Sequence, residues 1–571
     1  MKTYLSRAVL LAAYAVVLTE SLGAAHLLTR GVLAFAWILA VASAIWWTRK
    51  PKFVRRSITD ALLMAIIATI LGILAFIAVK SPPNSTDAMA YHLPRVLFWA
   101  QQRSVQFFPT PYLNQIMLQP FAEYLMLHTY ILSGGDRFIN LIQWFGCLTS
   151  IVAVAAIAEE FGADLRGQLL AALFCATLPN GILQATGAKN DYLLAAWLAC
   201  AAYFILRASC GSRGGSRFDI VLAGLALGLA LGTKATAYLF VAPLWLAIAI
   251  PAWKWWRAHL PDIALIALCS LALNAPQYIR NYDLSGSPMG FDSAQGDGKF
   301  RWQNEHFGWR ATVSNILRHS TEQLGARSER WNQGLYNAAV SVHKTLGLDV
   351  NDPSTTWHWT NYEPPRNANH ETNAPNRWHL AILALCFLVM PWRSPRLFLY
   401  LCGLIAGFVL FCAYLKWQPF MARMFLPLFV LACPAVSIVR PKIVQLALVV
   451  FLLDVSKPYL LENWVRPLKG PHSLLKTSHD DAYFNDLHPW NIEAETLEAV
   501  DAAARSGCMV VGIDINELQL EYPFEALLRE RNPQVQFVHV NVTNASKKYE
   551  RPGALHPCVI VKPGSARIWI Q

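Results

Sequence analysis

The chain has 571 residues, of which 55% are hydrophobic and only 15% charged, and its formal net charge is +12. Its mean hydropathy is +0.33. So few charges exclude an ordinary soluble globular protein. No segment resembles a nucleic-acid-binding module, so the positive charge predicts membrane lipids and a lipid phosphate, and no nucleic acid, as partners.

Apolar runs close to the ~20 residues needed to cross a bilayer recur along the chain. They predict an all-α polytopic membrane protein with about thirteen transmembrane helices. The first run is interpreted as an uncleaved span rather than a signal peptide. The predicted spans cover residues 8–27, 31–47, 58–79, 138–158, 168–185, 192–207, 220–232, 235–252, 263–279, 380–392, 397–415, 420–439 and 443–455.

Lys and Arg gather in alternate short loops, which predicts the orientation because basic loops stay in the cytoplasm. The prediction is a multi-pass protein of the plasma (inner) membrane with a cytoplasmic amino terminus and an external carboxyl-terminal part. The basic side chains are those of Arg49, Lys50, Lys52, Arg55, Arg56, Arg207, Arg213, Arg217, Lys254, Arg257, Arg393, Arg396, Arg440 and Lys442.

The pattern divides the chain into five parts. Residues 1–57 form an amino-terminal hairpin with a basic loop, and residues 58–280 form a membrane core that includes the first loop region, 80–137. The long loop region, 281–377, precedes the last membrane helices, 378–456. The tail, 457–571, is predicted to be a small soluble α/β domain.

In the tail, helices are expected at 494–505 and 517–531, and strands at 508–514, 535–540 and 558–562. The tail has no glycine-rich phosphate loop, so no chemistry is assigned to it. Cys508 and Cys558 each begin a strand-like run, and both a disulfide and two free thiols are compatible with this pattern.

Both loop regions carry structure of their own. In the first, 88–103 and 117–133 are expected to be short interfacial helices interrupted by Pro94 and Pro120. The long loop region exceeds the usual length of a structureless loop. Its tryptophans favour an aromatic surface near headgroups or sugars: Trp302, Trp309, Trp331, Trp357 and Trp359.

Asp87 is the leading candidate for chemistry, because it follows the predicted span 58–79 at the membrane surface, where ionisable groups are costly. As an isolated residue it would be interpreted as a helix N-cap. Tyr91 shares its helical face, and His92 and Arg95 follow within two turns. A carboxylate in this company can act as a general base toward an attacking hydroxyl.

Two further acids, Glu123 and Asp191, are expected on the same side of the membrane. Capping, or pairing with a neighbour such as Lys189, explains either one by itself. Together with Asp87 they could bind a divalent cation such as Mg²⁺ or Mn²⁺, or orient sugar hydroxyls. The sequence leaves the metal and any cofactor undecided.

Basic groups accompany these acids. Lys234 and Arg423 lie in predicted outer turns, where they either snorkel to the interface or bind a lipid phosphate. Glu371 and His379 lie where the long loop region re-enters the membrane, and they are candidates to complete the site. Two histidines at the spacing of His370 and His379 are a weak metal signal.

These motifs resemble the GT-C superfamily of polytopic glycosyltransferases, which use lipid-phosphate sugar donors. The similar segments are 87–95, 120–124, 189–191, 232–234 and 370–379. The chain looks closest to the phospholipid-carrier-dependent branch, related to protein O-mannosyltransferases and aminoarabinose transferases. In this chain Ala88 follows Asp87, where many members carry a second acid.

The resemblance implies that Asp87 is the catalytic base, that Glu123 and Asp191 organise the site, and that Lys234 and Arg423 contact the donor phosphate. Tyr91, His92, Arg95, Lys189, Glu371 and His379 are the other expected substrate-binding residues. The predicted reaction transfers a sugar, with inversion, from a polyprenyl-phosphate donor to a hydroxyl of a glycan, lipid or protein.

The alternative function is a transporter or flippase of lipid-linked sugars. Such proteins usually place their ionisable groups near the middle of the bilayer, between internal repeats. Here the acids cluster at one interface and no repeat is evident, so the enzyme is preferred.

Overall fold

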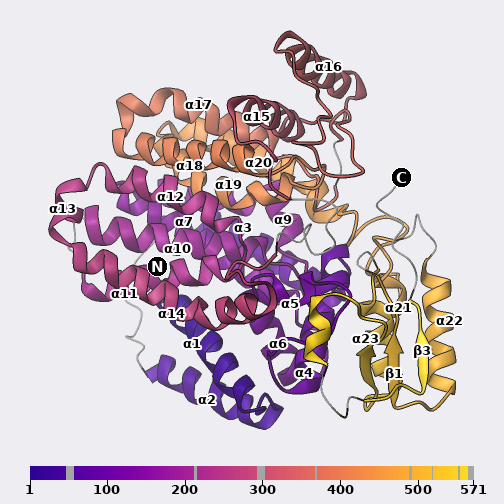
Figure 1. Ribbon diagram of the computed structural model, residues 1–571. Coiled ribbons are helices and arrows are strands. Elements are labelled where there is room, and N and C mark those ends of the chain that lie inside the picture. Colours follow the sequence, from indigo (N-terminus) through magenta and orange to yellow (C-terminus); the bar gives the residue numbers. More distant parts are fainter. Residues whose placement is uncertain are drawn as a thin grey trace.

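The computed structural model describes residues 1–46, 57–210, 215–291, 302–366, 369–487, 492–516, 519–550, 553 and 555–563. The basic cluster 49–56, on which the predicted orientation depends most, and Arg213 lie outside the described residues. Figure 1 shows a helical bundle with a small sheet at one end, which we call the sheet end. Helix α13 (Trp253–Ala258) lies at the opposite end.

The bundle consists of helices that follow the predicted apolar runs. They are α1 (Lys2–Ala24), α2 (Arg30–Trp46), α3 (Ile58–Lys80), α7 (Leu141–Glu160), α8 (Leu165–Ala176), α9 (Pro179–Gln184), α10 (Asp191–Cys210), α11 (Arg217–Leu231), α12 (Ala237–Ala249), α14 (Leu260–Ser285), α17 (Arg377–Arg393), α18 (Pro395–Tyr414), η2 (Ala422–Phe425), α19 (Leu426–Ala432), η3 (Cys433–Ile438) and α20 (Lys442–Leu461).

Seven of the described helices are long and apolar enough to cross a membrane, namely α1, α3, α7, α10, α14, α18 and α20. The prediction of an all-helical, polytopic membrane protein is confirmed. Two of the thirteen predicted runs are not continuous helices. The run 168–185 divides into α8 and α9 at Pro179, and 420–439 is a short helix between two 3-10 turns, because proline removes a helical hydrogen bond.

Helix α10 is the centre of the bundle and packs most extensively against α7 and α11. Small residues allow the helices to approach closely, as in many membrane bundles. A Cβ atom added to Gly224 or Gly228 of α11 would lie 2.9 Å from an atom of α14. These two glycines therefore set the contact between α11 and α14.

The first loop region folds into η1 (Ala88–His92), α4 (Leu93–Gln102), α5 (Asn114–Met117) and α6 (Phe121–Ser133). At Pro94 the helix changes its type but does not break. Pro94 lies in the first turn of α4, directly after the π-helical turn η1, and the Leu93 N–H donates to the Ala88 carbonyl across this junction. Pro120 does separate two helices, since α6 begins directly after it.

The long loop region contains α15 (Trp309–Gln323) and α16 (Glu329–Thr345). Buried Arg318 ties α15 to the segment that follows α16. Its guanidinium donates to the Val350 carbonyl at 2.8 Å and to the Thr356 hydroxyl at 2.7 Å, and it lies over the Trp417 ring. The described part of this region is therefore a folded unit attached to the bundle.

The tail is the small α/β domain that its pattern predicts. After the short helix α21 (His479–Ala482) come α22 (Ile492–Arg505), β1 (Val510–Ile513), α23 (Tyr522–Arg531), β2 (Gln536–His539), η5 (Ala545–Tyr549) and β3 (Val559–Val561). The sheet is parallel with strand order β2-β1-β3. Cys508 and Cys558 form a disulfide, so the bridge is the alternative that the structure contains.

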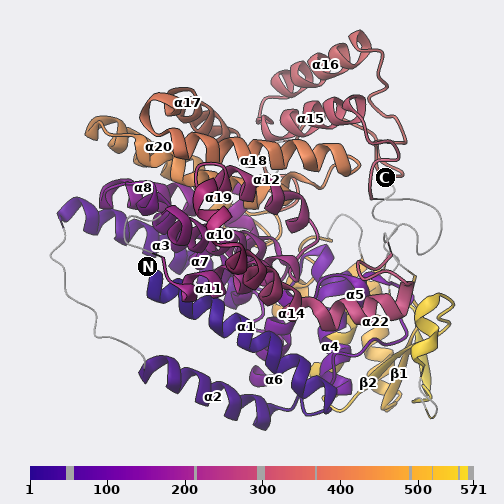
Figure 2. The same ribbon diagram turned by 60° about the vertical axis from the view of Figure 1, so that its left-hand side comes forward.

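The tail packs on the first loop region, and Figures 1 and 2 both show its sheet beside α4. The Gln101 side chain of α4 accepts from the Phe537 N–H at 2.8 Å and donates to the Phe537 carbonyl at 2.9 Å, which covers the edge strand β2. Glu521 pairs with His539 at 2.9 Å and accepts a hydrogen bond from Gln115, all within the buried contact. The tail is thus firmly attached at the sheet end.

Candidate active site

A cavity of about 180 Å³ lies at the sheet end, where the first loop region, the long loop region, the bundle and the tail meet. Seven acidic, basic or histidine side chains line it: Asp87, Lys189, His358, His370, Glu371, Arg423 and Asp486. A pocket with several convergent charged groups is the default location for an active site. Four of the seven, Asp87, Lys189, Glu371 and Arg423, are residues that the sequence analysis gives as site residues.

Asp87 precedes a single π-helical turn, η1, a distortion that is frequent at functional sites. Its side chain does not cap the helix. Instead, the carboxylate pairs with Arg423 at 2.6 Å and accepts the Tyr91 hydroxyl at 3.1 Å. Burial alone raises the pKa of this carboxyl, but the charges of Arg423 and Lys189 outweigh it and hold the pKa below its ordinary value. Asp87 is therefore ionised at neutral pH.

Two further ion pairs surround the pair of Asp87 and Arg423. Lys189 Nζ lies 2.5 Å from Glu371 Oε1, and Lys234 Nζ lies 2.5 Å from Asp191 Oδ1. Lys189 and Lys234 both interact electrostatically with Asp87, and Arg423 also interacts with Asp191. The structure thus brings Asp87, Asp191 and their three cations into one charged cluster.

Arg466, from the start of the tail, is connected to this cluster through Glu371, the partner of Lys189. Its guanidinium donates to Glu371, to the Asn84 side chain at 2.9 Å and to the Thr186 hydroxyl at 3.0 Å. A Cβ atom on Gly187 would lie 3.0 Å from the same guanidinium, so this position accommodates little more than a glycine. Arg466 is fully buried and joins four segments that are distant in sequence.

Glu371 consequently lies between two cations, with Lys189 on one carboxylate oxygen and Arg466 on the other. Burial raises the pKa of Glu371, but these two charges outweigh it and lower the pKa to about 2. Lys189 is thereby held at the cavity wall by an anion that is itself fixed by the tail. Glu371 therefore fixes the position of Lys189, and because Glu371 is shared with Arg466, its single negative charge does not cancel both positive charges.

Glu123 does not line the cavity. It is fully buried in α6, and its Oε1 lies 3.0 Å from Arg95 Nη1 and 2.9 Å from His92 Nδ1. Arg95 also donates to the Leu118 carbonyl at 2.7 Å and to the Gln115 carbonyl. Glu123, Arg95 and His92 therefore form a separate, sealed group that fixes α4 against α6. The expected meeting of all three acids occurs for Asp87 and Asp191, whereas Glu123 lies apart.

His379 is also absent from the cavity wall. It is buried in α17, where its Nε2 lies 3.2 Å from the Thr177 hydroxyl and its ring packs on Phe174. Within the described residues, no three His, Cys, Asp or Glu side chains lie close enough to hold a metal ion. The weak metal signal of the two histidines thus finds no support in the described part of the chain.

An apolar groove of about 400 Å³ adjoins the charged cluster and is formed by α15, α17, α18 and α19. The η2–α19 segment connects the two sites directly. Arg423 and Met424 face the charged cavity, whereas Phe425, Leu428 and Phe429 line the groove. The consecutive residues Met424 and Phe425 thus line the charged cavity and the apolar groove, respectively.

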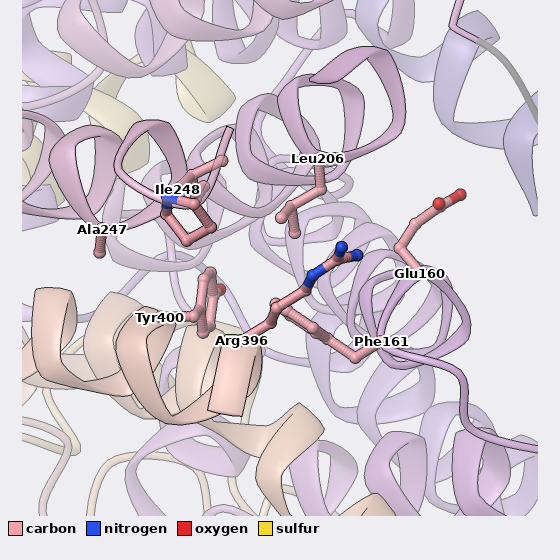
Figure 3. Close-up of a pocket in the computed structure, with 8 residues that line it drawn as sticks. Glu160, Phe161, Leu206, Ala247, Ile248, Arg396 and Tyr400 are labelled. Carbon is pink, nitrogen blue, oxygen red and sulfur yellow. The ribbon is translucent and has the colours of Figure 1, made fainter. Parts of the chain in front are cut away.

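A third cavity lies between α7, α10, α12 and α18 (Figure 3), with Pro251, just before α13, among its lining residues. Glu160 and Arg396 are the charged residues at this cavity. Its volume is about 20 Å³, and about 10–15 Å³ is needed to hold a single water. It is too small for a substrate and lies away from the sheet end.

The sequence interpretation missed Arg466 and Asp486. A basic residue just beyond a span that is predicted to end outside contradicts the positive-inside rule, and this signal could have singled out Arg466. Asp486 has no comparable signal. It is near the cavity only because the tail folds back onto the first loop region, where the Thr86 hydroxyl donates to it at 3.0 Å.

Comparisons with known proteins show a sequence-family match for part of the chain and distant structural likenesses. No curated protein matches. Among solved structures, apo ArnT from Cupriavidus metallidurans is 14% identical with a TM-score of 0.48, and the match covers 86% of this chain and 88% of ArnT. ArnT bound to undecaprenyl phosphate is 16% identical with a TM-score of 0.45, over 83% of this chain and 75% of ArnT.

The archaeal oligosaccharyltransferase AglB from Archaeoglobus fulgidus, in complex with an inhibitory peptide and a dolichol-phosphate, is 13% identical with a TM-score of 0.42. That match covers 81% of this chain and 64% of AglB. These likenesses are too distant to carry an argument about the chemistry of this chain. Residues 119–279 match the sequence family described as dolichyl-phosphate-mannose-protein mannosyltransferase. For this segment, which includes Lys189, Asp191 and Lys234, the expected resemblance to glycosyltransferases that use lipid-phosphate donors is confirmed.

Proposed function

We propose that this protein is a membrane glycosyltransferase that moves a sugar from a polyprenyl-phosphate donor to an acceptor hydroxyl. The observation that carries the proposal is the charged cavity of Asp87, Lys189 and Arg423 directly beside an apolar groove. A polyprenyl-phosphate sugar has the same two-part character. The family match of residues 119–279 supports the same donor class.

The donor occupies both sites. Its phosphate lies against Arg423, Lys189 and Lys234, since arginine and lysine bind phosphate oxygens strongly. Its prenyl chain follows Phe425 and α19 into the apolar groove, which is an environment as apolar as the lipid from which the chain comes. The sugar then lies in the charged cavity within reach of Asp87.

The reaction is a single displacement. The acceptor oxygen attacks the anomeric carbon, its proton passes to the Asp87 carboxylate, and the bond from the anomeric carbon to the phosphate oxygen breaks. Polyprenyl phosphate leaves with the bonding electron pair, and Arg423 and the two lysines stabilise its negative charge. Attack from the face opposite the leaving group inverts the anomeric configuration.

Donor binding also prepares the base. In the free protein Arg423 holds Asp87 at 2.6 Å and keeps the carboxylate a weak base. When the donor phosphate accepts hydrogen bonds from the Arg423 guanidinium, the electrostatic attraction between Arg423 and Asp87 weakens, and the pKa of the Asp87 carboxyl rises. Donor binding thus makes proton acceptance by Asp87 more favourable.

By the basic-loop pattern, this site faces the outer, periplasmic side of the plasma membrane, with the amino terminus in the cytoplasm. The acceptor is therefore a glycan, lipid or protein of the cell envelope. Asp191 positions Lys234 rather than reacting itself, because its described contact is the ion pair with that lysine.

The test is release of free polyprenyl phosphate by the purified protein in lipid nanodiscs. The donor is the ³²P-labelled polyprenyl-phosphate sugar fraction extracted from the source membranes, and the acceptor is a detergent extract of the cell envelope. A glycosyltransferase releases labelled polyprenyl phosphate with time. A transporter or flippase moves the donor intact, so an unchanged donor pool would refute the proposal.

A further inference from the structure

We infer that the cavity contains a binding site for a saccharide acceptor, formed by a tryptophan wall (Trp302, Trp357 and Trp359) opposite the charged cluster, together with Asp486 of the tail. This inference rests on the proposed function and names the acceptor class of the same cavity. All four residues line that cavity.

The tryptophan wall offers flat aromatic surface along the cavity. The Trp302 and Trp357 ring centroids are 4.9 Å apart, and the Trp359 ring lies against His358 at 4.2 Å. The Trp359 side chain is 54% exposed even though it belongs to a folded unit. A large aromatic ring can stack on the apolar C–H face of a sugar ring, as it does on other flat apolar groups.

The backbone at Trp359 is held in a conformation that such a residue rarely adopts. Its φ is 61°, in the left-handed region, where bulky side chains are outliers. Outliers of this kind persist only where the surrounding structure enforces them, and they cluster at ligand sites. The backbone strain at Trp359 is therefore an energetic cost of placing this side chain in the cavity wall.

The wall is fixed relative to the reacting groups. The Lys416 N–H donates to the Trp302 carbonyl at 2.8 Å, and the Trp357 N–H donates to the Trp417 carbonyl at 2.8 Å. The same stretch of chain continues to Arg423. A ring stacked on the wall is thus held at a set position from the proposed leaving group, as positioning for catalysis requires.

Asp486 supplies the hydroxyl acceptor that a sugar edge requires. His370 lies 2.9 Å from its Oδ1 and Thr86 donates to its Oδ2 at 3.0 Å, so the carboxylate has one orientation. Each carboxylate oxygen has a further lone pair for a hydroxyl donor. An aromatic face beside a fixed carboxylate matches a ring with an apolar face and a hydroxyl edge.

The experiment uses the polyprenyl phosphate release assay with two acceptor fractions from the source envelope. One is the saccharide fraction after exhaustive proteolysis, and the other is the protein fraction after chemical deglycosylation. We expect the saccharide fraction to accelerate release and the deglycosylated protein to leave it unchanged. Acceleration by the deglycosylated protein alone would overturn the saccharide assignment while leaving the proposed function intact. Release with the whole envelope extract but with neither fraction would overturn the saccharide assignment in favour of a lipid acceptor. No release even with the whole extract would instead count against the glycosyltransferase itself.

Variants then locate the site. Trp359→Ala should raise KM for the saccharide fraction about tenfold, which corresponds to ~1.4 kcal/mol, with less than about a twofold change in kcat. Trp359→Phe should restore most of the affinity, and Asp486→Asn should raise KM in the same direction. The control is Trp331→Ala, a similarly exposed tryptophan on α16 outside the cavity, which should behave as wild type. An unchanged KM in Trp359→Ala, or an equal loss in Trp331→Ala, would refute the wall as an acceptor site.

Discussion

Asp87 and Glu123 are both carboxylates paired with an arginine, but they lie in different surroundings. The Asp87 side chain is 21% exposed at the cavity, whereas Glu123 is fully buried between α4 and α6. Arg423 lines the cavity, and in the proposed reaction a substrate phosphate displaces its ionic partner. Arg95 is fully buried and surrounded by carbonyls and by Glu123.

The same pair of residue types therefore serves two purposes. In an ion pair at a cavity, either charged side chain can bind a ligand, because the ligand can replace the other side chain as its partner. A sealed ion pair fixes two helices, and removing one partner leaves an uncompensated buried charge. Asp87 and Glu123 thus differ in whether a ligand can reach them, and this difference leads to the following expected effects.

The largest expected effect is on turnover in Asp87→Asn. Loss of a positioned general base typically lowers kcat by about 10²–10⁴-fold. The asparagine is nearly isosteric and lies at a partly open site, so we expect normal insertion and melting. Initial rates of polyprenyl phosphate release and a melting curve in detergent measure both quantities. Turnover close to wild type would remove Asp87 from the mechanism.

The second effect is on stability in Glu123→Gln. Breaking a buried ion pair at one partner costs about 3–5 kcal/mol, so the melting temperature should fall markedly. The remaining folded protein should still release polyprenyl phosphate at a rate near wild type. Glu363→Gln is the control, because Glu363 pairs with Arg366 and both side chains are largely exposed, and exposed pairs contribute only about 0–1 kcal/mol. A stable but inactive Glu123→Gln protein would contradict the assignment of a structural role.

The third effect is on donor affinity in Arg423→Lys. Lysine keeps the charge but loses the planar fork that holds a phosphate through two hydrogen bonds. We expect the Kd for free polyprenyl phosphate, measured by titration in nanodiscs, to rise about tenfold, or ~1.4 kcal/mol. Arg440→Lys is the control, since Arg440 is largely exposed and lies outside the cavity. Equal affinities in the two variants would argue against a phosphate site at Arg423.

The smallest effect is on the pH dependence of kcat/KM. Since Arg423 and Lys189 outweigh burial and hold the pKa of Asp87 below its ordinary value, Asp87 stays ionised as the pH falls. Activity should therefore persist down to the ordinary aspartate pKa of about 3.9, as far as the protein remains folded. Removing the cation in Arg423→Gln raises the pKa of Asp87 and moves the acidic limb to higher pH. Coincident profiles of the two proteins between pH 4 and 7 would show that Asp87 does not titrate in this reaction.

Much of the fold could be predicted because its signals are local. Apolar runs predict membrane helices, and the alternation in the tail predicts α22, β1, α23, β2 and β3 in the correct order. Asp87, Lys189, Glu371 and Arg423 were recognisable because charged residues at the ends of apolar runs need a reason. They meet because those ends lie on one side of the bundle.

The remaining features depend on packing between distant segments. Nothing near Glu123 in the sequence says that α4 closes over it, and nothing near His379 says that Phe174 and Thr177 enclose it. Arg466 reaches Asn84 and Thr186 only after the tail has docked. The pattern of a single sequence predicts where helices end, but it does not predict which of the charged residues at those ends are buried by distant segments.

Arg466 and Asp486 both follow α20, the last candidate span. The ion pairs around Lys189 therefore stay incomplete during most of translation, because Arg466 can reach Glu371 only after α20 and the start of the tail have been made. A chain stalled before this point would have its earlier helices but would lack the second cation on Glu371. The geometry of the proposed site is in this way tied to a late stage of synthesis.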